Sequence, residues 1–266
     1  MLILIWLFFI GLIFGSFLNV LADRLPRGET ILGRSKCESC KHELAWHDLV
    51  PIISFTLLKG KCGYCSKPFS SEYIFAEIGT GMMFVLTWYL SQLNHFQPVQ
   101  SIVLLGVTST LIVMFLADMR YKIIPDSMQV VFGFLAVLIH SLAFIRGDIE
   151  ISVYLQQFGR MLLDGVMVMA PLLLIFLITK GKGMGFGDVK YSFVVGLLLG
   201  MWNGFIALYI SFVLGGVVGA YLLFIKKMDR KKAIPFGPYL FIGTYIMYFF
   251  ETDIILLIQK LYGLSP

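Results

Sequence analysis

The feature that most constrains this chain is a series of long apolar stretches separated by short polar loops. About 20 apolar residues cross the hydrocarbon core of a bilayer as a helix. Composition agrees: 58% of the residues are hydrophobic and the mean hydropathy is +0.86, whereas a soluble domain averages about 45–50% apolar residues. The sequence therefore predicts an all-α polytopic membrane protein. Eight transmembrane helices are expected, at residues 2–21, 73–91, 101–117, 127–145, 161–179, 189–204, 205–225 and 237–258.

Lysine and arginine are distributed unevenly among the loops between these stretches. The loops at residues 22–72, 118–126, 180–190 and 226–236 hold 18 of the 21 Lys and Arg residues. Cytoplasmic loops of membrane proteins carry such an excess of positive charge. We therefore expect these four loops at the cytoplasmic face and both termini on the outer side. A missed helix would break this alternation, so the charge pattern supports a count of eight.

The lengths of the loops predict the domain organisation. Residues 1–21 form the first transmembrane helix, which we expect to be retained because no small-residue cleavage site follows it. Residues 22–72 form the one sizeable loop, and residues 73–266 form a membrane domain of seven helices. Within that domain, the sixth and seventh helices are expected to meet around Trp202-Asn203-Gly204.

All four cysteines of the chain lie in the long loop. Cys37 and Cys40 form one CxxC pair, Cys62 and Cys65 form a second, and 21 residues separate the pairs. Two CxxC turns at this separation are typical of a zinc ion held by four thiolates. Four thiolates leave no position open for water, so the predicted zinc is structural. The alternative is a pair of disulfides, which a reducing cytoplasmic location disfavours.

Asp118 and Asp188 each stand where an apolar stretch meets a basic loop that contains proline or glycine. In the expected topology both lie at the cytoplasmic face, at ends of the third and sixth helices. Two carboxyls that are too close for both to ionise provide one acid and one base, which together can activate water. Glycines at 181, 183, 185 and 187 permit a close approach. The pair therefore predicts an aspartic protease site in the membrane.

Each aspartate also has a simpler interpretation. Asp188 follows a glycine turn, where Asp is a common helix N-cap. Asp118 would be a solvated residue at a helix C-terminus, although the helix dipole disfavours an anion there. Asp126 is interpreted as the N-cap of the fourth helix, since it follows Pro125.

A non-enzymatic function is the competing prediction. The chain would then be a membrane transporter, or a scaffold that presents a structural zinc loop. A transported proton or cation needs acidic groups within the spans. The sequence offers none in mid-span, which argues against such a pathway.

Several motifs resemble one known family. They are GSFLNVLADRLP at 15–26, the two CxxC pairs, DMRYKIIPD at 118–126, GMGFGDVK at 183–190 and IPFGP at 234–238. In this order they are similar to the bacterial type IV prepilin peptidases. The segment from Gly185 to Asp188 also matches the GxGD motif that this family shares with presenilin-type intramembrane aspartyl proteases. The resemblance places the two catalytic aspartates at Asp118 and Asp188, and Asp126 at a further motif position.

The resemblance implies an enzyme of the bacterial inner membrane. Members of the family remove the basic leader of type IV prepilins or type II secretion pseudopilins after a glycine, at the cytoplasmic face. Many then methylate the new N-terminus with S-adenosylmethionine, and the cysteine-bearing loop is the part associated with that activity. The expected partners are therefore these pilin-like substrates and membrane lipid, with no nucleic acid.

The methyl-donor site is less well marked in the sequence. No glycine-rich nucleotide loop follows a strand, so a Rossmann-type site is unsupported. Gly60 falls on a glycine of the family segment and is a candidate for cofactor binding, with a turn residue as the alternative. Glu72, Tyr73 and Glu77 stand at the start of the second helix and are interpreted as interfacial residues, with contact to the substrate or the cofactor as the alternative.

Overall fold

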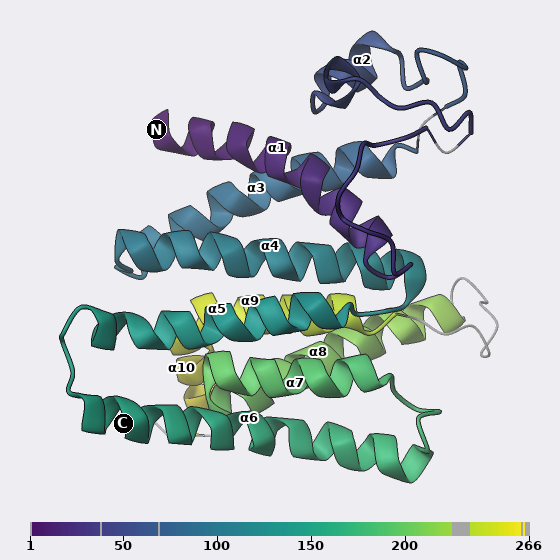
Figure 1. Cartoon of the computed structure of the whole chain (residues 1–266). Coiled ribbons are helices and arrows are strands. Elements are labelled where there is room, and N and C mark those ends of the chain that lie inside the picture. The colour runs from purple at the N-terminus through teal and green to yellow at the C-terminus, as the bar shows by residue number, and fades with distance from the viewer. Residues whose placement is uncertain (1, 38, 69, 225–234, 262, 264–266) are drawn as a thin grey trace. The chain divides into compact units, whose positions relative to one another are not determined.

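The computed structural model describes residues 2–37, 39–68, 70–224, 235–261 and 263, and helices dominate these residues (Figure 1). Apart from two isolated bridges, Lys36 to Glu43 and Lys61 to Pro68, the described part contains no strand pairing. The basic loop predicted at 226–236 lies largely outside the described residues. The helices are α1 Leu2–Arg24, η1 Trp46–Leu49, α2 Ile53–Leu57, α3 Glu72–Leu93, α4 Pro98–Tyr121, α5 Asp126–Ile145, α6 Ile151–Thr179, α7 Phe186–Leu199, α8 Met201–Phe224, α9 Gly237–Phe249 and α10 Glu251–Leu261.

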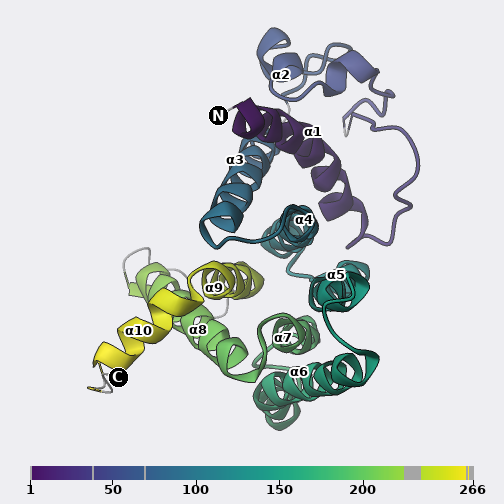
Figure 2. The same ribbon diagram turned by 90° about the vertical axis from the view of Figure 1, so that its left-hand side faces the viewer.

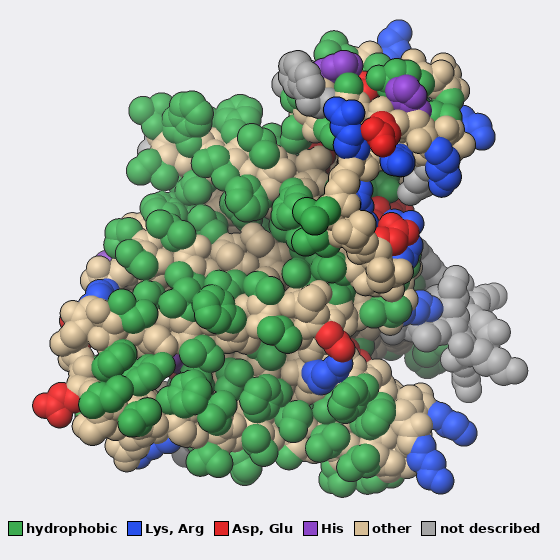
Figure 3. Space-filling model, in the orientation of Figure 1, with side chains coloured by type: hydrophobic (Ala, Val, Ile, Leu, Met, Phe, Trp, Pro, Cys, Tyr) green, Lys and Arg blue, Asp and Glu red, His purple; other side chains and the backbone are tan. Residues whose placement is uncertain are grey.

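The predicted fold class is confirmed. Six helices of the described residues, α1, α3, α4, α5, α6 and α8, are long and apolar enough to cross a membrane, and the bent pair α9 and α10 would make a seventh span. At 14 residues, α7 falls short of a full span although it occupies the predicted sixth stretch. Hydrophobic side chains cover much of the helical surface in Figure 3, as lipid-facing helices require.

Two predicted helix boundaries in the C-terminal part are wrong. The break between the sixth and seventh stretches falls at Gly200, not at Trp202-Asn203-Gly204. Gly200 has a φ of +76°, a left-handed conformation that only glycine adopts at little cost, so it ends α7. The predicted eighth helix is also interrupted, because the chain turns by 91° at Phe250 between α9 and α10.

The chain divides into two compact units, Met1–Ala117 and Asp118–Pro266. In the first unit α1 packs closely on α3, because glycines line the contact. A Cβ added to Gly11 would lie 2.7 Å from the Cα of Gly81, and one added to Gly15 would lie 2.8 Å from the Cα of Glu77. Small residues let membrane helices approach in this way. The cysteine-bearing loop connects these two helices.

In the second unit α7 is the central helix and contacts α5, α6, α8 and α9. Figure 2 views α5, α7 and α9 nearly end-on. α7 reaches α6 through glycines, since a Cβ on Gly196 would lie 2.6 Å from the carbonyl oxygen of Asp164. The hydroxyl of the fully buried Tyr191 donates a hydrogen bond of 3.0 Å to Thr244 on α9. The N-terminal end of α7 is thereby fixed within the unit.

Candidate functional site

Asp118 lies in the last turn of α4, and its side chain is buried with 5% of its surface exposed. Its Oδ2 accepts a hydrogen bond of 2.9 Å from the backbone N–H of Gly237, the first residue of α9. The positive end of the α9 dipole therefore faces the Asp118 carboxylate. The dipole of α4, which has its negative end at Asp118, disfavours that charge. A Cβ at Gly237 would lie 2.7 Å from the same oxygen. Glycine is the residue that permits this approach.

Asp188 lies in the first turn of α7 and is also buried. The interpretation of Asp188 as an N-cap is wrong, because Gly185 takes that position and the backbone N–H of Asp188 donates to the Gly185 carbonyl at 3.2 Å. The Asp118 carboxyl is close enough to act on Asp188 electrostatically. Two buried carboxyls, one at the C-terminal end of α4 and one at the N-terminal end of α7, therefore lie in the same unit, and their direct contact remains a prediction from the sequence.

Gly187 brings the start of α7 against the loop that follows Asp118. A Cβ added to Gly187 would lie 3.3 Å from the Cβ of Ile124, tighter than most real contacts. The loop before α7 turns through left-handed conformations at Lys180, with φ +51°, and Gly181, with φ +74°. The predicted close approach of the glycine loop therefore occurs at its last glycine.

Asp126 differs from the two buried aspartates. It is the first residue of α5 rather than its N-cap, because Pro125 is extended and takes the cap position. Its side chain is 72% exposed and forms an ion pair with Lys190 of α7. Asp126 thus links the starts of α5 and α7 at the surface. An exposed, paired carboxylate is a poor candidate for acid–base chemistry.

Gln129 is a polar residue of this region that sequence reasoning missed. It is 5% exposed, and its Nε2 donates to the Ile124 carbonyl at 3.4 Å. Its Oε1 is buried without a hydrogen-bond partner in the part of the chain that the structure describes. The amide also lies 3.9 Å from the position of a Cβ on Gly187. The sequence did contain a feature that could have identified this residue, namely a single glutamine three residues after the start of an otherwise apolar helix.

The four cysteines form a second candidate site, in the first unit. Their sulfur atoms all lie within 4.8 Å of one another, and the Sγ atoms of Cys37 and Cys65 are 3.8 Å apart. Tetrahedral coordination with bonds near 2.3 Å places sulfurs about 3.8 Å apart, so the cluster fits a metal ion held by four thiolates. A disulfide would bring two sulfurs to about 2.05 Å. All four cysteines are free, against the alternative of two disulfides.

The two CxxC turns have the same backbone geometry. The N–H of Cys37 donates to the His42 carbonyl and that of Cys62 to the Lys67 carbonyl, both at 2.9 Å. The N–H of Cys40 lowers the pKa of Cys37 to about 7, which favours the thiolate that a metal needs. At Cys65 the N–H of Lys67 also lowers the pKa, but burial and the surrounding thiols outweigh it and raise the pKa to about 11.

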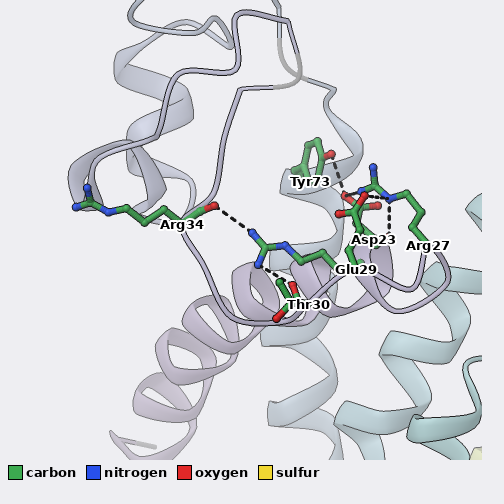
Figure 4. A network of polar contacts seen from close by, with 7 residues as sticks. Asp23, Arg27, Glu29, Thr30, Arg34 and Tyr73 are labelled. Atoms are coloured by element: carbon green, nitrogen blue, oxygen red, sulfur yellow. Dashed lines mark hydrogen bonds and ion pairs between the residues drawn. The ribbon is translucent and has the colours of Figure 1, made fainter.

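A polar network holds the loop against the ends of α1 and α3 (Figure 4). The phenol of Tyr73 donates to Asp23 at 3.2 Å, and Arg27 forms ion pairs with Asp23 and Glu29. The guanidinium of Arg24, at the end of α1, donates hydrogen bonds to four backbone carbonyls of the loop. These are the carbonyls of Thr30, Ile31, Gly33 and Arg34.

Glu77 is buried on α3 and is not the interfacial residue that the sequence suggested. Its carboxylate accepts the backbone N–H of Ile52 at 3.1 Å. Ile52 has a φ of +61°, an uncommon and strained conformation for a β-branched residue. Gly60 has a φ of +71°, in agreement with a turn residue before the second CxxC pair. The contact of Glu77 with Ile52 and the turn at Gly60 both shape the loop within the first unit.

Two family models match successive parts of the chain. Residues 9–91 match the model of the bacterial peptidase A24 N-terminal domain, and residues 105–220 match that of the type IV leader peptidase family. A prepilin leader peptidase/N-methyltransferase of Pseudomonas putida is 30% identical over 89% of this chain and 87% of its own. One of Bacillus subtilis is 31% identical over 94% and 95%, and one of Stutzerimonas stutzeri is 28% identical over 89% and 87%. No solved structure matches.

Proposed function

Because this chain belongs to the bacterial peptidase A24 family of prepilin leader peptidases/N-methyltransferases, we propose that it is an aspartic endopeptidase with Asp118 and Asp188 as its catalytic pair. The observation that carries this proposal is the burial of both carboxyls in one compact unit, where Asp118 lies within electrostatic reach of Asp188. One carboxylate takes a proton from water while the other, protonated, donates to the leaving amine. Gly237 supports the pair through its N–H to Asp118.

The proposed substrates are type IV prepilins or type II secretion pseudopilins. The relatives are named for cleaving prepilin leaders, and the site suits a substrate held in the same membrane. Cleavage removes the basic leader after a glycine. Because positively charged loops face the cytoplasm, we place loops 22–72, 118–126, 180–190 and 226–236, and the carboxyl pair, at the cytoplasmic face of the bacterial inner membrane. Both termini then lie outside.

We further propose that the cleaved substrate is methylated on its new N-terminal amine. The methyl group moves from the sulfonium of S-adenosylmethionine to the amine, which loses a proton, and S-adenosylhomocysteine is released. The first unit is the proposed location, because it holds the cysteine cluster and matches the N-terminal model of the family. Zinc is the proposed metal since four thiolates suit it. It would stabilise the loop that contains the candidate Gly60.

A membrane assay with a prepilin substrate tests the catalytic pair. Asp118→Asn and Asp188→Asn should each abolish cleavage while the protein still accumulates in the membrane, because each removes one half of the acid–base pair. Asp126→Asn is the matched control. It should keep most of the activity, since Asp126 is exposed and paired with Lys190. Normal processing by either of the first two variants would rule out the pair.

Mass spectrometry of the substrate N-terminus separates the remaining possibilities in one measurement. A cut and methylated product supports both activities. A cut but unmethylated product limits the chain to proteolysis. An uncut product with the wild-type chain would favour the transporter or scaffold alternative.

A further inference from the structure

The last helix of the described chain does not continue the helix before it. α9 has 13 residues, and α10 turns from it by 91° at Phe250. Figure 2 shows the same relation, with α9 seen nearly end-on and α10 seen along its length. α9 runs in the same direction as the membrane-crossing helices, so a helix at right angles to α9 lies in the plane of the bilayer. α10 therefore turns away from the direction of α9 instead of extending it.

One contact and one exposed residue indicate that α10 lies at the edge of the bilayer rather than in its middle. Asn203, at the start of α8, donates a hydrogen bond of 2.7 Å to the carboxylate of Glu251, the first residue of α10. α8 is one of the six helices that qualify as spans, so its first turn marks a membrane surface. The neighbouring Trp202 is 73% exposed, and exposed Trp is enriched at membrane–water interfaces.

α10 is amphipathic, and the protein leaves its apolar side uncovered. Ile254, Leu257, Ile258 and Leu261 recur at helical spacing and form one stripe. None of the residues of α10 is buried, and Leu257 and Leu261 are 57% and 74% exposed. The opposite side holds Thr252, Asp253, Gln259 and Lys260, with Leu256 as its one large apolar residue. Such a helix binds an interface that is apolar on one side and aqueous on the other.

We propose that α10 lies flat in the membrane interface at the end of the bundle opposite Asp118 and Asp188, with its apolar stripe inserted among lipid acyl chains. The partner is lipid, because the Asn203–Glu251 contact holds α10 at the level of the membrane surface and its exposed stripe is apolar. A second copy of the chain is the competing occupant. The proposal rests on membrane embedding alone and goes beyond the proposed enzymatic function.

The position of α10 sets the depth of the carboxyl pair. α9 runs from Gly237, which binds Asp118, to Phe249, a length of about 20 Å at 1.5 Å per residue. α7 runs a similar 14 residues from the turn of Asp188 to Leu199. The hydrocarbon core is about 30 Å thick. With α10 held at one interface, helices of this length bring both carboxyls to the cytoplasmic face only where the bilayer around them is thinner than about 30 Å.

Depth-dependent quenching of fluorescence tests the position of α10 without reference to activity. A fluorescent amino acid would be introduced singly at positions 257, 258, 259 and 260 of the full chain, which avoids the native cysteines. Each variant would be reconstituted in phosphatidylethanolamine and phosphatidylglycerol vesicles whose acyl chains carry bromine at a shallow or a deep carbon.

Two properties of the quenching are expected if α10 lies flat. Shallow bromines should quench strongly at 257 and 258 and weakly at 259 and 260, with the period of about 3.6 residues of a helix. Deep bromines should quench little at all four positions. A steady change of depth along the four positions would show a span instead. Absence of quenching at every position, or cross-linking of 257 between two copies, would also overturn the proposal.

Discussion

At the scale of single residues, the contact between Gly237 and Asp118 carries the most information. It joins residues 119 positions apart, and it supplies a backbone donor and a helix dipole to a carboxyl that is otherwise poorly placed. Sequence reasoning recognised that Asp118 is unfavourable at a helix C-terminus. It could not identify the compensating group, because no local pattern encodes a contact between two distant helix ends.

The prediction at Gly237 follows from the space around it. Gly237→Ala should reduce cleavage by about 100-fold, since a Cβ 2.7 Å from Oδ2 must displace the Asp118 carboxylate. Initial rates of prepilin cleavage measure the effect. Gly216→Ala is the control, because nothing lies within 4 Å of a Cβ there. Similar cleavage rates for both variants would mean that displacement of the Asp118 carboxylate does not affect cleavage.

Gln129 gives a stability prediction. Gln129→Met should raise the free energy of unfolding by about 1 kcal/mol, because it removes a buried carbonyl that has no partner and loses only a long hydrogen bond. Thermal unfolding in detergent, followed by circular dichroism, measures the change. A loss of stability would show that Oε1 has a partner in solution, for example an ordered water.

At the scale of elements, hydrophobic pattern predicted where the helices occur, and backbone detail decided where they end. The eight apolar stretches each carry helix, because length and hydropathy suffice to identify membrane helices. The break at Gly200 was displaced in the prediction, since Gly200, Asn203 and Gly204 can each interrupt an apolar run. The 91° turn at Phe250 has no glycine or proline to mark it, so the sequence suggested one continuous helix.

The packing of α7 on α6 gives a prediction at this scale. Gly196→Ala should destabilise the protein by about 1–3 kcal/mol, because the added methyl meets the Asp164 carbonyl at 2.6 Å and overpacks the contact. Gly159→Ala, also in a helix but with no neighbour within 4 Å, should instead stabilise it by up to about 1 kcal/mol. Thermal unfolding of the two variants side by side provides the comparison, and equal shifts would contradict this account.

At the scale of the whole molecule, the chain keeps its two candidate sites in separate compact units. The four cysteines lie within Met1–Ala117, whereas both carboxyls and Gly237 lie within Asp118–Pro266. The CxxC spacing was sufficient to predict the cysteine cluster, because each pair is set by its own local turn. Prediction of the carboxyl pair required both the family motifs and the distribution of Lys and Arg. Neither alone indicates that two residues 70 positions apart in the sequence lie close in the fold.

This separation predicts that the two proposed activities respond differently to loss of the metal. Cys62→Ser should lower the zinc content of the purified chain and strongly reduce methylation, because the loop loses one of four ligands. Cleavage should be reduced much less, since the described contacts of the carboxyl pair lie in the other unit. Zinc analysis, with mass spectrometry of the product, measures both. An equal loss of cleavage and methylation would show that the units do not act separately.

The hydrogen bond from Gly237 also has a consequence for the synthesis of this protein. Translation proceeds from the N-terminus, so Asp118 and Asp188 enter the membrane well before α9 does. Until α9 follows, Asp118 lacks both the backbone donor and the helix dipole that face it in the finished molecule. The site that we propose as catalytic is therefore completed only after α9 has been made, and a ribosome stalled before α9 would leave a chain with both aspartates but without this contact.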